Sequence, residues 1–148
     1  MNPTDDFLSD APKKARKPRE SSFWQQMKQA MKQHEPKWSA TRLESRVTHG
    51  VPDVLLLDHL GHWHLVELKT TERNKVDISP HQVAFASKHS RGSCWIAVKL
   101  KTGSASEIFL YRGESAMDLR MDGLATKPAL KLSAPVDWPL FFQTLANR

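Results

Sequence analysis

The sequence predicts a mixed α/β fold, and three observations carry that prediction. An amphipathic helix pattern occurs near the N-terminus, two apolar runs joined by a short turn follow it, and a second helix pattern separates them from two further apolar runs. The chain has 148 residues, which suits one domain because domains most often have about 100–150 residues. We therefore expect a mixed β-sheet of about five strands, flanked by helices.

Residues 1–20 have the composition of a disordered arm, so the folded domain is expected to span residues 21–148. The arm contains several prolines and acidic residues and little apolar surface to bury. Its basic run is compatible with a solvated tail, a DNA-tethering arm or a targeting signal. The residues of that run are Lys13, Lys14, Arg16, Lys17 and Arg19.

The first predicted helix runs from residue 21 to residue 34. Its apolar side chains recur at helical intervals, Ser21 or Ser22 can cap its start, and Pro36 ends it. These apolar residues, Phe23, Met27, Ala30 and Met31, are expected in the core.

Alternating apolar and polar residues predict a strand at 41–47, and Gly50 and Pro52 then interrupt the chain. Two apolar runs at 54–57 and 63–68 follow, separated by a loop at 59–61. Gly61, the last loop residue, can adopt the positive φ that three-residue hairpin loops require. This is the clearest hairpin in the sequence.

The remaining elements are a helix, two strands and a terminal helix. Ser79 and Pro80 provide the cap and first position of a helix at 81–89. Apolar runs at 93–100 and 107–111 predict strands paired across Gly103. A short helix at 137–146, capped by Asp137, would bury Trp138, Phe141, Phe142 and Leu145 against the domain.

Composition limits the classes of function. The formal net charge of +6 suggests a polyanionic partner, either nucleic acid or an anionic membrane surface. No run approaches the roughly 18 apolar residues that a bilayer span needs, so we expect a soluble, cytoplasmic protein. The single cysteine, Cys94, excludes an internal disulfide and lies in an apolar run, where burial is the expected state.

Counting outward from the 59–61 loop places Asp53 directly opposite Glu67. Opposed residues share a face of the sheet, and Lys69, two residues beyond Glu67, lies on that face as well. Two opposed carboxylates repel each other, and a divalent cation would offset the repulsion. Mg²⁺ or Mn²⁺ suits such a set, to which the backbone carbonyl of Leu68 would add a ligand. The alternative is a surface salt bridge without further function.

The order of these residues resembles a known nuclease signature. Gly50-Val51-Pro52-Asp53, an apolar strand, a turn and Val66-Glu67-Leu68-Lys69 look like the pattern of the PD-(D/E)XK nuclease superfamily. The sequence is especially similar to the small phage-type, VRR-NUC-like and Holliday-junction-resolvase-like branches. Residues 79–82 resemble the later helix that carries a glutamine.

The resemblance implies a restriction-endonuclease-like core and a metal-dependent DNA endonuclease. It assigns Asp53 and Glu67 as ligands of Mg²⁺ or Mn²⁺, Lys69 as the catalytic lysine and Gln82 as an auxiliary site residue. Many relatives also place a glutamate on the first helix, whose interior carries glutamines here. Three residues are candidates to replace it, Glu20, Glu35 and Glu44, and we favour Glu44 as a metal ligand because its predicted strand ends beside the hairpin.

Other residues are candidates for weaker roles. Arg42, Arg46 and Lys99 are candidate contacts to nucleic acid, alongside the basic arm. Of the five tryptophans, most are expected in the core, and an exposed one would be able to stack on an unpaired base. A zinc site is an alternative use of four histidines, although no carboxylate at a fitting spacing completes a tetrahedral set; these are His49, His59, His62 and His64.

Two alternatives to the enzyme remain open. The first is a non-catalytic nucleic-acid-binding module that retains the fold, and the second is a partner-binding regulator. No base-reading helix is recognisable, so structure-selective cleavage of branched, junction or flap DNA is expected rather than sequence-specific cleavage. Resolution of junctions would require two sites and hence a homodimer.

Overall fold

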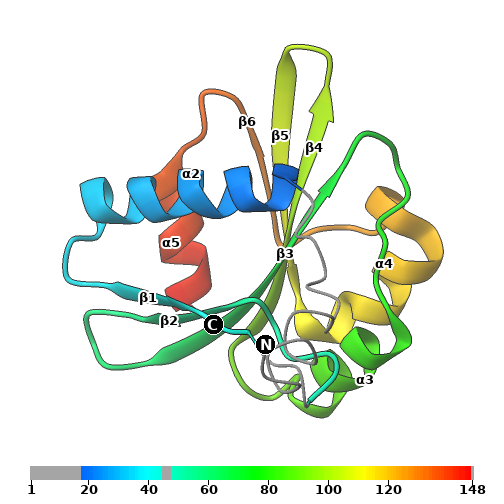
Figure 1. Ribbon diagram of the computed structural model, residues 1–148, viewed down its shortest axis with the longest axis horizontal. Coiled ribbons are helices and arrows are strands. Elements are labelled where there is room, and N and C mark those ends of the chain that lie inside the picture. Colours follow the sequence, from blue (N-terminus) through cyan, green and yellow to red (C-terminus); the bar gives the residue numbers. More distant parts are fainter. Residues whose placement is uncertain (1–17, 45–47, 148) are drawn as a thin grey trace, which may run out of the picture.

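Six strands form a mixed sheet whose spatial order follows the order of the chain (Figure 1). The structure is a computed structural model that describes residues 18–44 and 48–147. β3 and β4 pair in parallel, and every other neighbouring pair is antiparallel. The strands are β1 (Ser39–Arg42), β2 (Val54–Leu57), β3 (Trp63–Thr71), β4 (Cys94–Thr102), β5 (Ala105–Arg112) and β6 (Leu130–Ser133).

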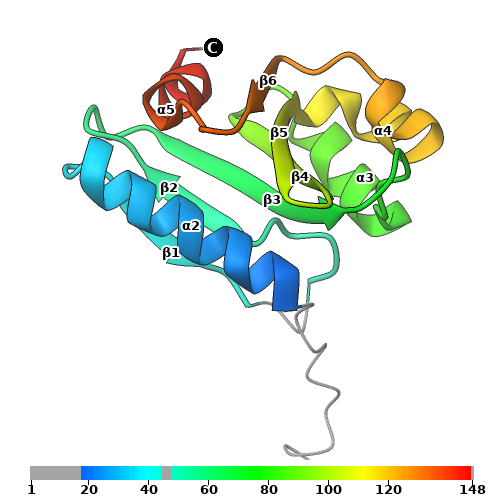
Figure 2. The ribbon, with the colours of Figure 1, turned by 90° about the horizontal axis from the view of Figure 1, so that it is seen from above.

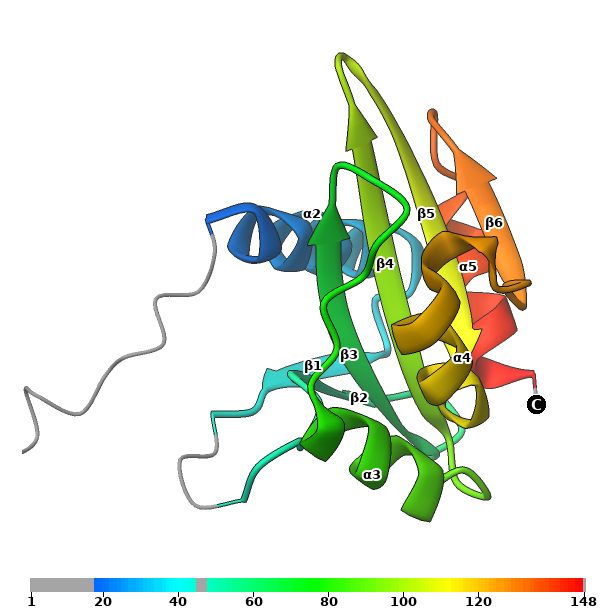
Figure 3. The ribbon, with the colours of Figure 1, turned by 90° about the vertical axis from the view of Figure 1, so that its right-hand side faces the viewer.

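Helices cover both faces of the sheet, as the views in Figures 2 and 3 show. On one face, α2 (Pro18–His34) and α5 (Trp138–Ala146) pack on a core that includes Val54, Leu56 and Val66. On the other face, α3 (Pro80–Lys88) and α4 (Ala116–Asp122) pack on a second core that includes Ile96. Two short 3-10 helices, Gly113–Ser115 and Gly123–Ala125, flank α4. The parallel pair β3–β4 is joined through α3, which is the usual crossover for parallel strands.

The predicted hairpin is confirmed with its register. Leu57 pairs with Trp63 and Val54 pairs with Val66. Asp58 and His62 close the loop through a backbone hydrogen bond of 2.9 Å, and Gly61 has a φ of 83°. Every later residue of β3 therefore faces the side that the sequence predicted, because register fixes the alternation along the whole strand.

The two later helices also begin where their caps predicted. The Ser79 hydroxyl accepts a hydrogen bond from the backbone N–H of Gln82, and the Gln82 side chain accepts one from the backbone N–H of Ser79. The two bonds make a capping box. The Asp137 side chain likewise caps α5 through the backbone of Leu140. The predicted core residues of α2 and α5 are buried, and so is Cys94.

Several sequence predictions are wrong in detail. The sheet has six strands rather than about five, because β6 was not recognised, and α4 was missed as well. The first helix begins at Pro18, so Ser21 and Ser22 lie inside it and neither caps its start. The first strand is residues 39–42 rather than 41–47, and residues 45–47 lie outside the described residues.

No helix in the described part of the chain combines the length and apolar character needed to cross a membrane. The α/β class with a mixed, helix-flanked sheet is confirmed.

Candidate active site

Asp53 and Glu67 lie opposite each other where β2 begins and β3 continues. Val54 pairs with Val66, so the next step outward places Asp53 against Glu67. The backbone N–H of Leu68 donates to Asp53 Oδ2 over 3.0 Å, which fixes the carboxylate against β3. The sequence-predicted pair is therefore brought together by strand register and held by the backbone.

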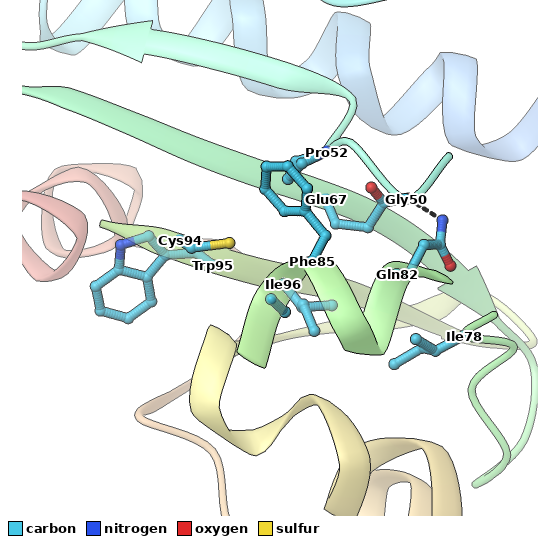
Figure 4. A pocket seen from close by; sticks show the side chains of 10 residues that line it. Gly50, Pro52, Glu67, Ile78, Gln82, Phe85, Cys94, Trp95 and Ile96 are labelled. Carbon is cyan, nitrogen blue, oxygen red and sulfur yellow. Dashed lines mark hydrogen bonds between the residues drawn. The ribbon is translucent and has the colours of Figure 1, made fainter. Parts of the chain in front are cut away.

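Gln82 reaches the same site from the first turn of α3. Its Nε2 donates to Glu67 Oε1 over 2.9 Å, while its Oε1 accepts from the backbone N–H of Ser79 (Figure 4). The capping box thus positions the amide with its donor group toward the carboxylate. Gln82, which the sequence suggested only by resemblance, lies in direct contact with Glu67.

Lys69 approaches Glu67 from the same strand. Its Nζ lies 3.8 Å from Glu67 Oε1, and the side chains of Lys69 and Glu67 are 14% and 8% exposed. Alternation along β3 places both on one face, since they are two residues apart. An ammonium group in this position partly balances the negative charge of the two carboxylates.

Glu67 is an unusual carboxyl group because it is buried beside another acid. Burial and the charge of Asp53 raise the pKa of Glu67 to about 9, although Lys69 acts in the opposite direction. Its Oε2 atom is buried and has no hydrogen-bond partner among the described residues. Without a bound cation, burial and the charge of Asp53 therefore favour the protonated form of Glu67.

A small pocket beside Glu67 leaves room for about one water molecule or ion. Its cavity volume is about 10 Å³, and its walls include Pro52, Gln82 and Phe85 (Figure 4). Gly50 brings the backbone of the Pro52 segment against α3, since a Cβ at Gly50 would lie 2.2 Å from the His81 carbonyl oxygen. Cys94 also lines the pocket, and burial, together with the charge of Glu67, raises the pKa of its thiol to about 11.

Glu20, in the first turn of α2, is a third acid whose charge acts on Glu67. Its charge contributes to the raised pKa of Glu67. Glu35 lies just beyond the opposite end of α2, and Glu44 is exposed two residues beyond the end of β1. β1 does end beside the hairpin, because Arg42 pairs with Val54 and the Leu43 N–H donates to the Asp53 carbonyl oxygen over 2.7 Å. Glu44 therefore stays a predicted ligand, and the effect of Glu20 on the pKa of Glu67 makes Glu20 a second candidate.

The residues at the site fit a hard divalent cation. Two carboxylates face each other, Glu67 Oε2 has no partner among the described residues, and Glu67 also lines a water-sized space. Within residues 18–44 and 48–147, no three His, Cys, Asp or Glu side chains converge enough to hold an ion by themselves. A Mg²⁺ or Mn²⁺ ion bound by one or two carboxylates would complete its shell with waters and phosphate oxygens. The Leu68 carbonyl remains a predicted ligand.

Some of the candidate nucleic-acid contacts lie in the described residues, and the others lie outside them. Arg42 lies over the ring of Trp24 on α2, and Lys99 donates to Gln26 Oε1 over 2.8 Å on the face opposite Glu67. Burial lowers the pKa of Lys99. Arg19 lies in the first turn of α2, and the remaining predicted contacts, Lys13, Lys14, Arg16, Lys17 and Arg46, lie outside the described residues. Lys99 is thus engaged within the protein and away from the carboxylates.

A polar cluster that sequence reasoning missed lies on the opposite face of β3. His64 contacts Asp58 Oδ2 through Nε2 at 2.8 Å and the Ser93 hydroxyl through Nδ1. Burial raises the pKa of Asp58, but hydrogen bonds from His64 and from the backbone of His62 and Leu60 outweigh it, and the pKa falls to about 2. The cluster links the hairpin loop to the start of β4.

The other histidines are also engaged elsewhere. Trp38 Nε1 donates to His59, and His49 stacks on His81 with ring centroids 5.1 Å apart. Their arrangement in the described residues offers no shared zinc site. The only sequence signal for the Asp58 cluster was the spacing of Asp58 and His64 on facing sides of a tight loop.

No protein-family model matches the chain, and no curated protein matches it either. The site geometry and the motif order therefore carry the functional argument.

Proposed function

We propose that this chain is a metal-dependent DNA endonuclease of the PD-(D/E)XK type. One observation carries the proposal: buried Glu67 faces Asp53 across a strand pair, in contact with Lys69 and Gln82. Burial and the neighbouring Asp53 make the ionised form of Glu67 costly, because a buried charge without a partner costs free energy. A cation that binds phosphate offers a reason for the pair.

The proposed reaction is hydrolysis of a phosphodiester bond by water. Asp53 and Glu67 would hold Mg²⁺ or Mn²⁺, with Glu44 or Glu20 as the candidate additional acid. When bound, such an ion lowers the pKa of a coordinated water and neutralises charge that develops on the phosphate. Lys69, whose Nζ lies 3.8 Å from Glu67 Oε1, would orient the attacking water. Gln82 fixes the orientation of the Glu67 carboxylate through its amide hydrogen bond.

DNA as the substrate rests on the resemblance and on the net charge of +6. The same charge would also serve RNA binding. Structure-selective cleavage of branched, junction or flap DNA is proposed because the chain offers no recognisable base-reading helix. Cleavage of both strands of a junction would use two copies of the chain.

The decisive experiment incubates purified protein with linear, nicked, flap, four-way-junction and single-stranded DNA. Each substrate is tested with Mg²⁺, with Mn²⁺ and with EDTA. Cleavage is expected with the metals only, and Asp53→Ala and Lys69→Ala should lower its rate by at least about 100-fold. Lys131→Ala, which removes a lysine ion-paired to Glu107 at 3.3 Å far along the sheet, is the matched control.

The outcomes separate the alternatives. A wild-type protein that cuts no substrate but binds DNA with strong salt dependence would be the non-catalytic binding module. A protein that shows neither cleavage nor salt-sensitive DNA binding would be the partner-binding regulator. The nuclease proposal would fail under either of these two outcomes.

A further inference from the structure

Trp63 stands apart from the other tryptophans because its side chain is largely exposed. It is 56% exposed, whereas the other four, Trp24, Trp38, Trp95 and Trp138, are each 8% exposed or less. Its neighbour in the loop, Leu60, is 68% exposed. An indole exposed at a hairpin end contributes little to the core and presents its aromatic face to solvent.

Trp63 lies on the same face of the sheet as the carboxylate site. Residues 63, 65, 67 and 69 of β3 alternate to one side, and the pairing of β2 with β3 is continuous from Leu57 to Val54. Leu65 packs, like Phe85 of α3, against the second core, whereas Trp63 at the start of β3 is exposed. Trp63 and Glu67 therefore lie on one face of the sheet, the first exposed and the second buried, at a separation of roughly 13 Å along the strand.

The strand residues between Trp63 and the site on this face are uncharged, and Leu65 among them packs against the second core. Leu55, Leu57 and Leu65 are half-buried there, and Ser39 and Thr41 of the neighbouring strand β1 lie opposite Leu57 and Leu55. None of these five side chains carries a charge that would repel a phosphate backbone. A separation of roughly 13 Å corresponds to about four stacked nucleotides at 3.4 Å each.

We propose that Trp63 is a stacking platform for an unpaired base, so that the substrate is single-stranded a few nucleotides from the phosphate held at the carboxylate site. The inference rests on the proposed nuclease function for its placement, and it narrows the substrate to DNA with unpaired bases beside the cut. An exposed indole beside uncharged strand residues suits the face of a base, whereas paired bases in a duplex are already stacked on each other.

The test measures binding in EDTA, where no cleavage occurs. Fluorescein-labelled oligo(dT) and a blunt duplex are titrated with wild type, Trp63→Ala, Trp63→Phe and Met121→Ala. Met121 is 72% exposed on α4 and provides a matched control for loss of an exposed apolar side chain. Trp63→Ala should weaken oligo(dT) binding by roughly 5- to 150-fold, Trp63→Phe should restore most of it, and duplex binding should not change.

A second readout reports stacking itself. An oligonucleotide with one 2-aminopurine should lose fluorescence on binding the wild type, since that base is quenched when it stacks, and keep it with Trp63→Ala. Unchanged oligo(dT) binding by Trp63→Ala would overturn the inference. So would an equal loss of duplex binding, or a change in molar mass by light scattering, which would identify the surface as a contact between copies.

Failure of the two proposals is distinguishable. If wild type cuts no DNA with metal but its oligo(dT) binding depends on Trp63, the nuclease proposal fails and the stacking role stands. If wild type cuts DNA and Trp63→Ala binds oligo(dT) as wild type does, the stacking role fails alone.

Discussion

Gln82 donates its amide N–H to Glu67 Oε1 while its amide oxygen caps α3 through Ser79. One side chain thereby couples the start of a helix to the orientation of a buried carboxylate. The two roles use different atoms of the same amide, so substitutions can separate them.

Gln82→Glu should keep the cap and lose the contact with Glu67. A glutamate oxygen can still accept from the Ser79 N–H, but it has no N–H to donate and adds a charge beside Glu67. We expect cleavage to fall by about 10- to 100-fold with little change in Tm, because the orientation of the ligand is lost. Gln82→Ala should also lose the hydrogen bond from the Ser79 N–H, while the Ser79 hydroxyl still caps the helix, and should lower both the cleavage rate and Tm. Equal Tm losses in the two variants would contradict this separation, and activity assays with thermal melts check it.

Glu67 should make the metal-free protein less stable as pH rises. Its pKa of about 9 in the folded state exceeds the ordinary value of 4.5, so folding binds a proton between these pH values. The stabilising contribution is full below about pH 4.5 and is lost as pH rises toward 9. Glu67→Gln cannot ionise, so its Tm should exceed that of wild type by several degrees at pH 9.

Thermal melts in EDTA at several pH values measure this difference. The gain from Glu67→Gln should shrink toward pH 5, where wild-type Glu67 is protonated. Mg²⁺ should bind more tightly as pH rises toward 9, because binding displaces that proton. A Tm difference that is the same at every pH would sink the assignment of a protonated Glu67.

The hairpin and its two carboxylates could be predicted because strand pairing has a period of two. Once Gly61 fixed the loop, the partner of every residue followed by counting. α3 and α5 were predictable for a similar reason, since Ser79 and Asp137 cap them locally. These features depend on residues only a few positions apart.

The features that were missed depend on long-range packing. β6 has one buried residue, Leu132, and its pairing with β5 gives it a strand conformation that its own sequence barely signals. The influence of Glu20 on Glu67 requires knowing how α2 crosses the sheet, which no local pattern encodes. Ser93 reaches His64 only because β4 pairs in parallel with β3.

Asp58→Asn should destabilise the protein near neutral pH. Asp58 is a charged acceptor for His64 and for two backbone N–H groups, and an amide replaces only part of that set. The expected cost is about 1–3 kcal/mol. Because the folded pKa is about 2 against an ordinary 3.8, the contribution of the charge is present above about pH 4 and is lost as pH falls toward 2.

His62→Ala is the matched control for this prediction. His62 lies 3.7 Å from the same Asp58 oxygen, but its side chain is 67% exposed, so its loss should cost less than about 0.5 kcal/mol. Urea denaturation at pH 7 and pH 3 compares the variants. A cost for Asp58→Asn no larger than that for His62→Ala would show that the buried cluster contributes nothing to stability.

Gly50→Ala should disturb the site for two reasons, the positive φ of Gly50 and its close approach to the backbone of α3. Gly61→Ala is the control that shares only the first reason. Both glycines have positive φ, 85° and 83°, a conformation that costs an alanine about 1–2 kcal/mol. A Cβ at Gly61 would meet nothing within 4 Å, whereas one at Gly50 would lie 2.2 Å from the His81 carbonyl oxygen and 3.0 Å from the Gln82 nitrogen. Gly61→Ala should therefore lower the free energy of unfolding only by the cost of placing an alanine at positive φ.

Gly50→Ala must in addition push α3 away from the segment that carries Pro52 and Asp53. We expect a loss of about 3 kcal/mol or more in the free energy of unfolding, and a loss of metal-dependent cleavage even at temperatures where the variant is folded. The second effect follows because Gln82, at the displaced end of α3, would no longer reach Glu67. Equal destabilisation of the two alanine variants, with cleavage intact in both, would show that the close approach of Gly50 to α3 does not position the site.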